Sequence, residues 1–377
     1  MIPSQRHLFD IPDEIAYFNC AYMGPLLKTA RAAGHAGIDR KSLPWNVSPV
    51  DFFTESEKAR SLFATLVGAS ADDIAIISSA SYGIATAAKN IPLSRGLKIL
   101  LLEDQFPSNV YSWMELARAS GGEIVTIPTP ADYDWTSAVL KAIDDKVAIA
   151  ALPHNLWTDG ALLDLVAIGE KLKVQGAKLV LDVTQSLGAM PLDLARVKPD
   201  FLIAAAYKWL LGPYSVGFMY VAPEHHGGEP LEYNWLNRKG SENFAGLVDY
   251  VDEYQPGARR FDMGERANFA LMPVAVTALE QILAWGVANI QETLTHKTQD
   301  IAARCAGLGL TSLPDDKRAG HFLGLRRDGG LPKDLLDRLK AENIHVSVRG
   351  SSMRITPHLF NNEADSDRLL TALENIL

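Results

Sequence analysis

The stretch LVLDVTQSLGAMPLDLARVKPDFLIAAAYKWLLGPYSVGFMYV, Leu179–Val221, decides the fold of this chain. It contains three short apolar runs, LVLDV, DFLIAAA and VGFMYV. These runs lack clean polar alternation, which is typical of strands covered on both faces in a mostly parallel sheet. At the end of the second run stands Lys208, between Tyr207 and Trp209. Because removing an ammonium group from water is costly, a lysine at the end of a core strand requires a reason.

Four more runs of this kind precede the stretch: DDIAIISSA, LKILLLE, GEIVTIP and KVAIAALPH. Helical patterns separate several of them, for example SWMELARASGG and LLDLVAIGEKLKVQGA, whose final glycines fit helix ends. The alternation of strands and helices over residues 71–221 predicts an α/β fold with one large, doubly wound, mostly parallel seven-stranded sheet.

The pattern changes after this region. Residues 229–269 are rich in aromatic and arginine residues and poor in periodicity, which indicates an ordered, functional segment. A long helical stretch follows over about residues 272–307, and the tail reads as strand, helix, strand, strand, helix. We therefore expect an N-terminal segment (1–30) packed near the active site and the small domain, a large domain (31–270), and a connecting long helix with a small C-terminal α+β domain (271–377).

Composition excludes several classes of protein. The 377 residues are 47% hydrophobic and 21% charged, an ordinary globular balance, and the net charge of −9 indicates no attraction to nucleic acid or anionic membrane. No uncharged apolar run reaches the ~18 residues of a membrane span, and the first residues lack the pattern of a signal peptide. Cys20 and Cys305 form neither a disulfide framework nor a metal-ligand spacing. We expect a soluble cytoplasmic protein without a metal site.

Four features lie at the ends of predicted strands, where ligands bind in open α/β sheets. They are Lys208, Asp182, Phe106 and the turn SSASYG at residues 78–83. Each has a simple structural interpretation: a lysine that reaches solvent, an aspartate that caps a helix, a core phenylalanine and an ordinary turn.

Together the four features indicate pyridoxal 5′-phosphate as a cofactor. A buried lysine supplies an amine of lowered pKa for a Schiff base, and a carboxylate keeps the pyridine nitrogen protonated. A helix N-terminus with small, hydroxyl-bearing residues suits the phosphate. A flat apolar side chain suits one face of the ring.

The sequence resembles the class V aminotransferase family of fold-type I enzymes, a group that includes cysteine desulfurases, kynureninases, isopenicillin N epimerase-like proteins and cystine lyases. The resemblance runs from YFNCAYMGPL to MRITPHLFNNEAD and is most specific in the D-x-x-Q … K core and the FPSN turn. It implies that Lys208 is the Schiff-base lysine, Asp182 the partner of the pyridine nitrogen and Gln185 the residue that bonds the ring hydroxyl oxygen. Phe106 would stack on the ring, and residues 31–270 would form the cofactor-binding domain.

The same resemblance assigns further residues. Ala80 and Ser81 match the phosphate-binding turn, and Tyr207 can supply a donor there. Asn155 falls near the ring hydroxyl and the substrate carboxylate. It also implies a homodimer with shared active sites, in which Arg266 or Asn268 reaches the phosphate of the neighbouring subunit.

Arg354 matches the arginine that binds the substrate α-carboxylate. The alternation of Met353 and Ile355 with Arg354 and Thr356 is that of a half-exposed strand, so a solvent-facing arginine is the alternative. Arg349 is a nearby competitor for the role.

The sequence departs from desulfurases in two places. Ala205, Ala206 and Tyr207 precede the lysine where desulfurases have serine, glycine and histidine, and HVSVRGSSMRI has no cysteine where desulfurases carry the persulfide-forming thiol. Cys20 is expected to be a small buried residue. We expect an enzyme acting on a small α-amino acid, first an aminotransferase. The alternatives are a carbon–sulfur lyase, an isopenicillin N epimerase-like epimerase, or a binding protein that retains the fold.

Overall fold

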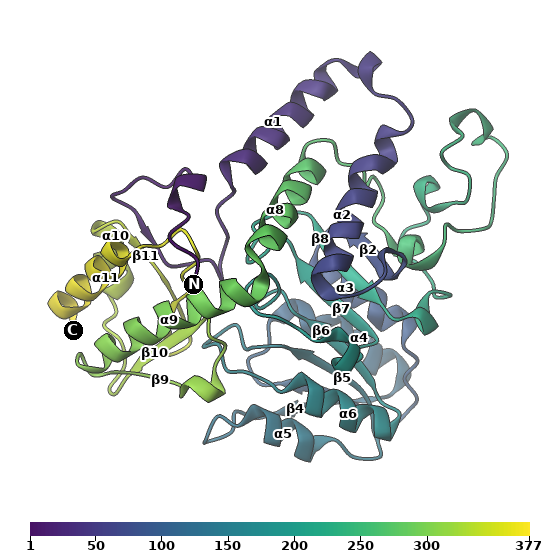
Figure 1. Cartoon of the computed structure of the whole chain (residues 1–377). Coiled ribbons are helices and arrows are strands. Elements are labelled where there is room, and N and C mark those ends of the chain that lie inside the picture. Colours follow the sequence, from purple (N-terminus) through teal and green to yellow (C-terminus); the bar gives the residue numbers. More distant parts are fainter.

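The computed structural model describes residues 1–377 and is organised around a seven-stranded sheet (Figure 1). In order across the sheet its strands are β2 (Ile74–Ile77), β8 (Gly217–Val221), β7 (Phe201–Ala205), β6 (Lys178–Asp182), β5 (Val147–Pro153), β3 (Lys98–Leu102) and β4 (Glu123–Ile127). Only β8 runs antiparallel to its neighbours. The predicted mostly parallel seven-stranded sheet is confirmed.

Helices cover both faces of this sheet, which explains why its inner strands are mainly apolar. Along β2, Ile74 and Ile76 join one hydrophobic core, whereas Ala75 and Ile77 join another on the opposite face. The first face carries α2 (Asp51–Val67), α5 (Trp135–Ala142), α6 (Leu165–Gln175), α7 (Leu194–Val197) and α8 (Leu271–Trp285). The second carries α3 (Ala80–Asn90) and α4 (Tyr111–Ser120).

The C-terminal part has its own antiparallel sheet and core. The sheet order is β12 (Ser347–Arg349), β13 (Ser352–Ile355), β10 (Leu323–Arg327) and β9 (Leu310–Ser312). Helices α9 (Val287–Ala306), α10 (Leu335–Ala341) and α11 (Glu363–Ile376) accompany it. The N-terminal segment joins this part, because β1 (Ala16–Tyr17) pairs in parallel with β11 (Ile344–His345). The domain limits at residues 30 and 270 stay a proposal.

The long helical stretch expected over residues 272–307 is two helices. Gly286 separates α8 from α9 with a positive φ of 76°, a conformation that glycine adopts without strain. The two helices meet at 76°, so the chain turns there from the large sheet toward the C-terminal part. No single helix has the length and apolar character of a membrane span; only this bent pair, taken together, meets the criterion.

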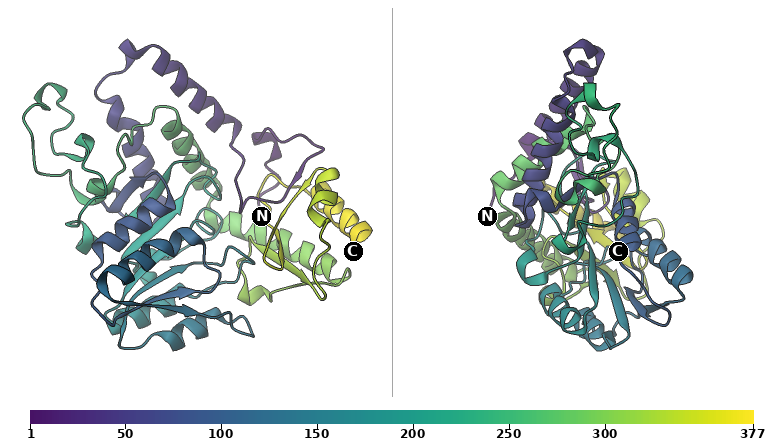
Figure 2. Two further views of the ribbon diagram at one scale, coloured as in Figure 1. Left: turned by 180° about the vertical axis from the view of Figure 1, so that it is seen from behind. Right: turned by 90° about the vertical axis from the view of Figure 1, so that its right-hand side faces the viewer.

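Two segments extend away from the large sheet. Helix α1 (Lys28–Ser42) and the loop that contains residues 238–254 project from the same side of the molecule (Figures 1 and 2). The segment 229–269 has only short 3-10 helices, as its lack of periodicity indicated.

Candidate active site

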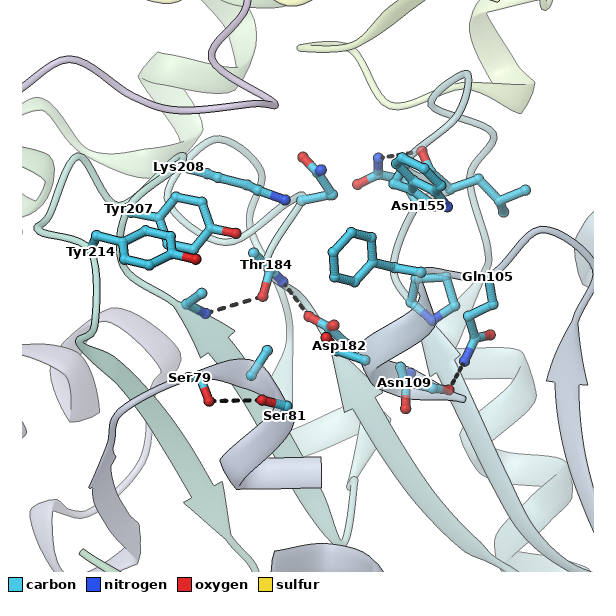
Figure 3. A pocket seen from close by; sticks show the side chains of 18 of the residues that line it. Ser79, Ser81, Gln105, Asn109, Asn155, Asp182, Thr184, Tyr207, Lys208 and Tyr214 are labelled. Atoms are coloured by element: carbon cyan, nitrogen blue, oxygen red, sulfur yellow. Dashed lines mark hydrogen bonds between the residues drawn. The ribbon is translucent and has the colours of Figure 1, made fainter. Parts of the chain in front are cut away.

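Lys208 lies in a turn that directly follows β7, at the carboxyl edge of the large sheet. A cavity of about 420 Å³ opens here, and the ends of β3, β5, β6 and β7 contribute to its wall (Figure 3). Of the residues singled out from the sequence, the following line it: Ala80, Ser81, Phe106, Asn155, Asp182, Gln185, Tyr207 and Lys208. The fold thus brings eight side chains from five separate segments to one place.

The ammonium group of Lys208 is held in an unfavourable setting. The residue is 6% exposed, and burial lowers its pKa to about 8, although nearby Asp182 opposes this shift. The positive charges of Arg354 and Arg349 add to the lowering. A neutral amine is the nucleophilic form of lysine, so this environment produces a reactive side chain near neutral pH.

Two aromatic rings border the Lys208 amine. Its Nζ lies 5.3 Å from the centroid of Phe106 and 5.5 Å from that of Tyr207. Trp157, which the sequence reading did not select, meets Phe106 edge-to-face at 5.4 Å and also lines the cavity. Flat apolar walls of this kind suit an aromatic ligand.

Asp182 is the last residue of β6, and its side chain is buried at the cavity. Burial raises its pKa, whereas hydrogen bonding to Thr184 and the charge of Lys208 oppose the rise. Its Oδ1 accepts the Thr184 N–H at 3.0 Å, and no cation lies within ion-pair distance of the carboxylate. A cationic group placed in the cavity would supply the missing counter-charge.

The N-terminus of α3 forms another part of the wall. Ser79 caps the helix by accepting the Tyr82 N–H at 3.1 Å, and its hydroxyl lies 2.9 Å from that of Ser81. The N–H groups of Ala80 and Ser81 have no intramolecular acceptor, because they are the first two of the helix. Free N–H groups and the helix dipole together favour an anion here.

Several lining residues were not predicted from the sequence: Gln105, Trp157, Thr184, Tyr214 and Ser215. Ser78 and Ser79 of the SSASYG turn and Ser108 and Asn109 of the FPSN turn also line the cavity. Tyr214 packs against Tyr207 with ring centroids 4.7 Å apart. Tyr214 follows Tyr207 closely in the sequence, which is a signal that it lies near the site. Only the fold shows which way its side chain points.

Asn155 and Gln185 present amides to the cavity. The buried Oδ1 of Asn155 has no hydrogen-bond partner, while its Nδ2 donates to the Leu156 carbonyl oxygen at 3.2 Å. A buried carbonyl oxygen without a donor is costly, so a ligand that donates to it would be favoured. Gln185 is held by the indole of Trp209 and the carbonyl oxygen of Ala21.

Arg354 lies on β13 and is 1% exposed. Its Nε donates to Ser347 Oγ at 2.9 Å and its Nη1 to the Trp157 carbonyl oxygen at 2.8 Å. All four residues of β13 are buried, so the expectation of a half-exposed strand is wrong, because other elements cover both faces of this sheet. No carboxylate pairs with Arg354, and burial lowers its pKa to about 10.

Arg266 and Asn268 lie outside the cavity of their own chain. Arg266 is fully buried, with Nε 3.3 Å from Asp262 Oδ2 and Nη1 2.7 Å from Asn237 Oδ1. Asn268 is exposed, and its Oδ1 accepts the N–H groups of Ala270 and Leu271 at the start of α8. The arginine is fully buried within its own chain, so Asn268 is the more accessible of the two for a neighbouring subunit.

Both cysteine side chains are buried. Cys20 is inaccessible, and burial raises the pKa of its thiol. Its Sγ lies 3.8 Å from the Lys208 carbonyl oxygen. Gly24 lies so close to the same oxygen that a side chain at position 24 would collide with it. The expected role of Cys20 as a small packing residue agrees with this position.

Comparison with known proteins places this site in a family. Residues 49–363 match the family described as aminotransferase class-V. An uncharacterized aminotransferase of Bacillus subtilis (strain 168), YcbU, is 26% identical over 338 residues, covering 82% of this chain and 81% of the relative. Isopenicillin N epimerase of Streptomyces clavuligerus is 24% identical over 347 residues, covering 86% of this chain and 87% of the relative.

The fold is also that of solved structures. A mutant of C-DES with glycine covalently linked to its PLP cofactor has a TM-score of 0.89 at 19% identity, covering 99% of this chain and 100% of that one. The cystine C-S lyase C-DES with its product cysteine persulfide has a TM-score of 0.85 at 18% identity, covering 97% and 98%.

Fold and site define a fold-type I pyridoxal-phosphate enzyme. The chain belongs to the class V aminotransferase family. The site fits the cofactor, since it combines a buried amine of lowered pKa, a buried carboxylate without a counter-ion and a helix N-terminus with free N–H groups.

Proposed function

We propose that this protein is an aminotransferase that acts on a small α-amino acid. The observation that carries the choice of substrate is Arg354, a buried guanidinium beside the cavity wall that has no carboxylate partner in its own chain, and the match to the aminotransferase class-V family favours the reaction. A buried cation is normally paired, and a planar guanidinium fits a carboxylate through two parallel hydrogen bonds. The α-carboxylate of an amino acid would be its partner.

The lining side chains then take defined roles. Pyridoxal phosphate supplies an electron sink when it is bound. Lys208 would hold the cofactor through its ε-amine and, once displaced by the substrate amine, would move the proton of the substrate Cα. Asp182 would keep the ring nitrogen protonated, Phe106 would cover one face of the ring, and Ala80 and Ser81 would bind the phosphate through their N–H groups.

A carbon–sulfur lyase and an epimerase remain the alternative reactions. The similarity to isopenicillin N epimerase and the fold shared with C-DES favour them. A cysteine desulfurase that forms a persulfide on its own thiol is not supported, because Cys20 and Cys305 are both fully buried. Transamination, carbon–sulfur lysis and epimerisation all begin on the same bound amino acid. The bond that lies perpendicular to the ring and the place where protons are returned decide among them.

An amino-acid screen with separate readouts tests the proposal. Purified holoenzyme is incubated with single α-amino acids and one keto acid, while keto-acid transfer, pyruvate plus ammonia, sulfide and optical rotation are followed separately. Transfer of the amino group to the keto acid supports an aminotransferase. Release of sulfide with pyruvate and ammonia would show that the enzyme is a carbon–sulfur lyase instead. Loss of optical rotation alone would show that it is an epimerase.

A spectrum tests whether the cofactor is attached as proposed. The holoenzyme should show a visible absorption band that borohydride removes and that Lys208→Ala lacks. A colourless wild type that stays colourless with added pyridoxal phosphate would favour a binding protein that retains the fold.

We also propose that the protein is a homodimer with shared active sites and that it is cytoplasmic. The segment 229–269 exposes Tyr233, Trp235 and Tyr250, and the region after α1 exposes Trp45. Aromatic side chains of this kind are enriched in interfaces, and both regions project from the same side of the molecule. Light scattering tests this, and a fully active monomer would contradict it.

A further inference from the structure

The amide of Gln185 is held at both ends by buried partners. Its Oε1 lies 3.1 Å from the indole Nε1 of Trp209, and its Nε2 lies 3.1 Å from the carbonyl oxygen of Ala21. Gln185 and Trp209 are both buried, and Gln185 lines the cavity. The protein therefore shields both of these hydrogen bonds from solvent.

The chemistry of the two partners determines which way the amide faces. An indole N–H can only donate, and a main-chain carbonyl oxygen can only accept. Oxygen must therefore face Trp209 and nitrogen must face Ala21, because the flipped amide would lose both hydrogen bonds and place two oxygens together. One N–H of Gln185 is used by Ala21, and the second remains for the cavity.

His321 holds the same residue from the main-chain side. Its Nε2 lies 2.7 Å from the carbonyl oxygen of Gln185, and its ring meets Trp209 edge-to-face at 4.4 Å. Burial lowers the pKa of His321 to about 4, so the ring is neutral near pH 7 and carries its proton on Nε2, where an acceptor lies. Gln185 is thus fixed at its main chain and at its side chain.

We propose that Trp209 is a positioning residue that, together with the Ala21 carbonyl oxygen, holds Gln185 so that it presents an N–H donor, and not an acceptor, to the cavity. This inference rests on the proposed function, in which the ring oxygen of pyridoxal phosphate is the group beside Gln185. A donor at this oxygen stabilises its negative charge. With the cofactor attached to Lys208, such a donor would lower the pKa of the nitrogen that joins the two, because it would stabilise the nearby negative charge.

A pH titration of the visible absorption band measures this effect without any turnover. Its midpoint is the pH at which half of the band has changed. Trp209→Phe keeps an aromatic ring but removes the N–H, so the Gln185 amide loses one of its two anchors and holds its N–H toward the cavity less firmly. We expect the midpoint of the purified holoenzyme to rise by about one pH unit, the size of one hydrogen bond to a charged group. An unchanged midpoint would overturn the inference.

Trp135→Phe is the matched control. Trp135 is also a buried tryptophan, but its indole N–H has no partner and it does not line the cavity. The same substitution there should leave the midpoint where it is in the wild type. An equal rise in both variants would show a general loss of packing and would refute the positioning role.

A double-variant cycle separates positioning from packing. If Trp209 acts through Gln185, then adding Trp209→Phe to Gln185→Leu should not move the midpoint further. Independent, additive shifts would contradict the inference.

Gln185→Glu keeps the test open if Trp209→Phe fails to fold. A carboxylate can only accept, so it would place negative charge beside the ring oxygen and should raise the midpoint more than Gln185→Leu does. A midpoint at or below that of Gln185→Leu would show that Gln185 does not act as a donor. A wild type without any visible band would instead contradict the proposed function itself.

Discussion

Arg354 Nη1 donates to the carbonyl oxygen of Trp157 at 2.8 Å, and this hydrogen bond joins β13 of the C-terminal sheet to the loop after β5 of the large sheet. The arginine therefore sits where the two parts of the chain meet, next to the wall of the cavity. Arg354 is a buried cation at this position and has no carboxylate partner, and we therefore propose that it binds the carboxylate of the substrate.

Arg354→Lys should lower kcat/KM for the best amino acid by about 10²-fold, or ~2.7 kcal/mol, and raise KM. Lysine keeps the charge but loses the planar fork that holds a carboxylate through two hydrogen bonds. Steady-state kinetics measure this, and simple amines, which lack the carboxylate, should be poor substrates for both forms. Arg349→Lys is the matched control and should have the smaller effect. A larger loss in Arg349→Lys would move the anchor to Arg349.

Asp182→Ala should leave the cofactor bound but remove nearly all turnover. Without the carboxylate the ring nitrogen loses its counter-charge and the ring becomes a poorer electron sink. Asp182→Glu should be intermediate, since it keeps the charge but not the geometry. Activity of the alanine variant within about tenfold of the wild type, or ~1.4 kcal/mol of barrier, would remove Asp182 from this role.

Uptake of pyridoxal phosphate by the apoenzyme should accelerate with pH up to about 8. Below this pKa only a minor fraction of Lys208 is neutral, and this fraction increases about tenfold per pH unit. Above the pKa most of the amine is already neutral. Stopped-flow absorbance measures the rate. Asp182→Asn should move the midpoint lower, because Asp182 raises the pKa of Lys208. A midpoint near ~10.4, the value of a solvated lysine, would contradict burial as the source of reactivity.

Arg266→Met should destabilise the fold by about 1–3 kcal/mol, because it leaves the buried Asn237 Oδ1 without its donor, whereas Asp262 keeps its two hydrogen bonds from Arg60. Chemical denaturation measures this loss. Asn268→Asp keeps an acceptor for the start of α8, so it should preserve stability. If Asn268 reaches the phosphate of the neighbouring subunit, the new negative charge should weaken cofactor retention by about tenfold or more.

A mixing experiment tests the shared site. Subunits of Lys208→Ala and Asn268→Asp, unfolded and refolded together, should regain activity, because one site of each mixed dimer combines the intact Lys208 of one chain with the intact Asn268 of the other. Activity no higher than the sum of the two separate variants would show that each site is built from one chain. Stronger cofactor loss in Arg266→Met than in Asn268→Asp, at equal stability, would restore Arg266 as the contact.

The sequence by itself determined the architecture of the large domain. Apolar strands alternating with helical patterns leave few arrangements other than a doubly wound sheet, and Lys208 and Asp182 each follow such a strand directly. Because the carboxyl ends of parallel strands meet at one edge, the convergence of these two residues could be anticipated from their positions along the chain.

Only the tertiary structure decided the remainder of the site. Trp157, Tyr214 and Ser215 lie in loops, where no periodicity shows which way a side chain points. The alternation around Arg354 resembled a half-exposed strand, yet β13 is covered on both faces, and Gly286 bends what read as one helix. Burial depends on what packs against an element from distant parts of the chain. Local sequence does not carry that information, so the burial of Arg354 and the hydrogen bond between Trp209 and Gln185 could be found only in the fold.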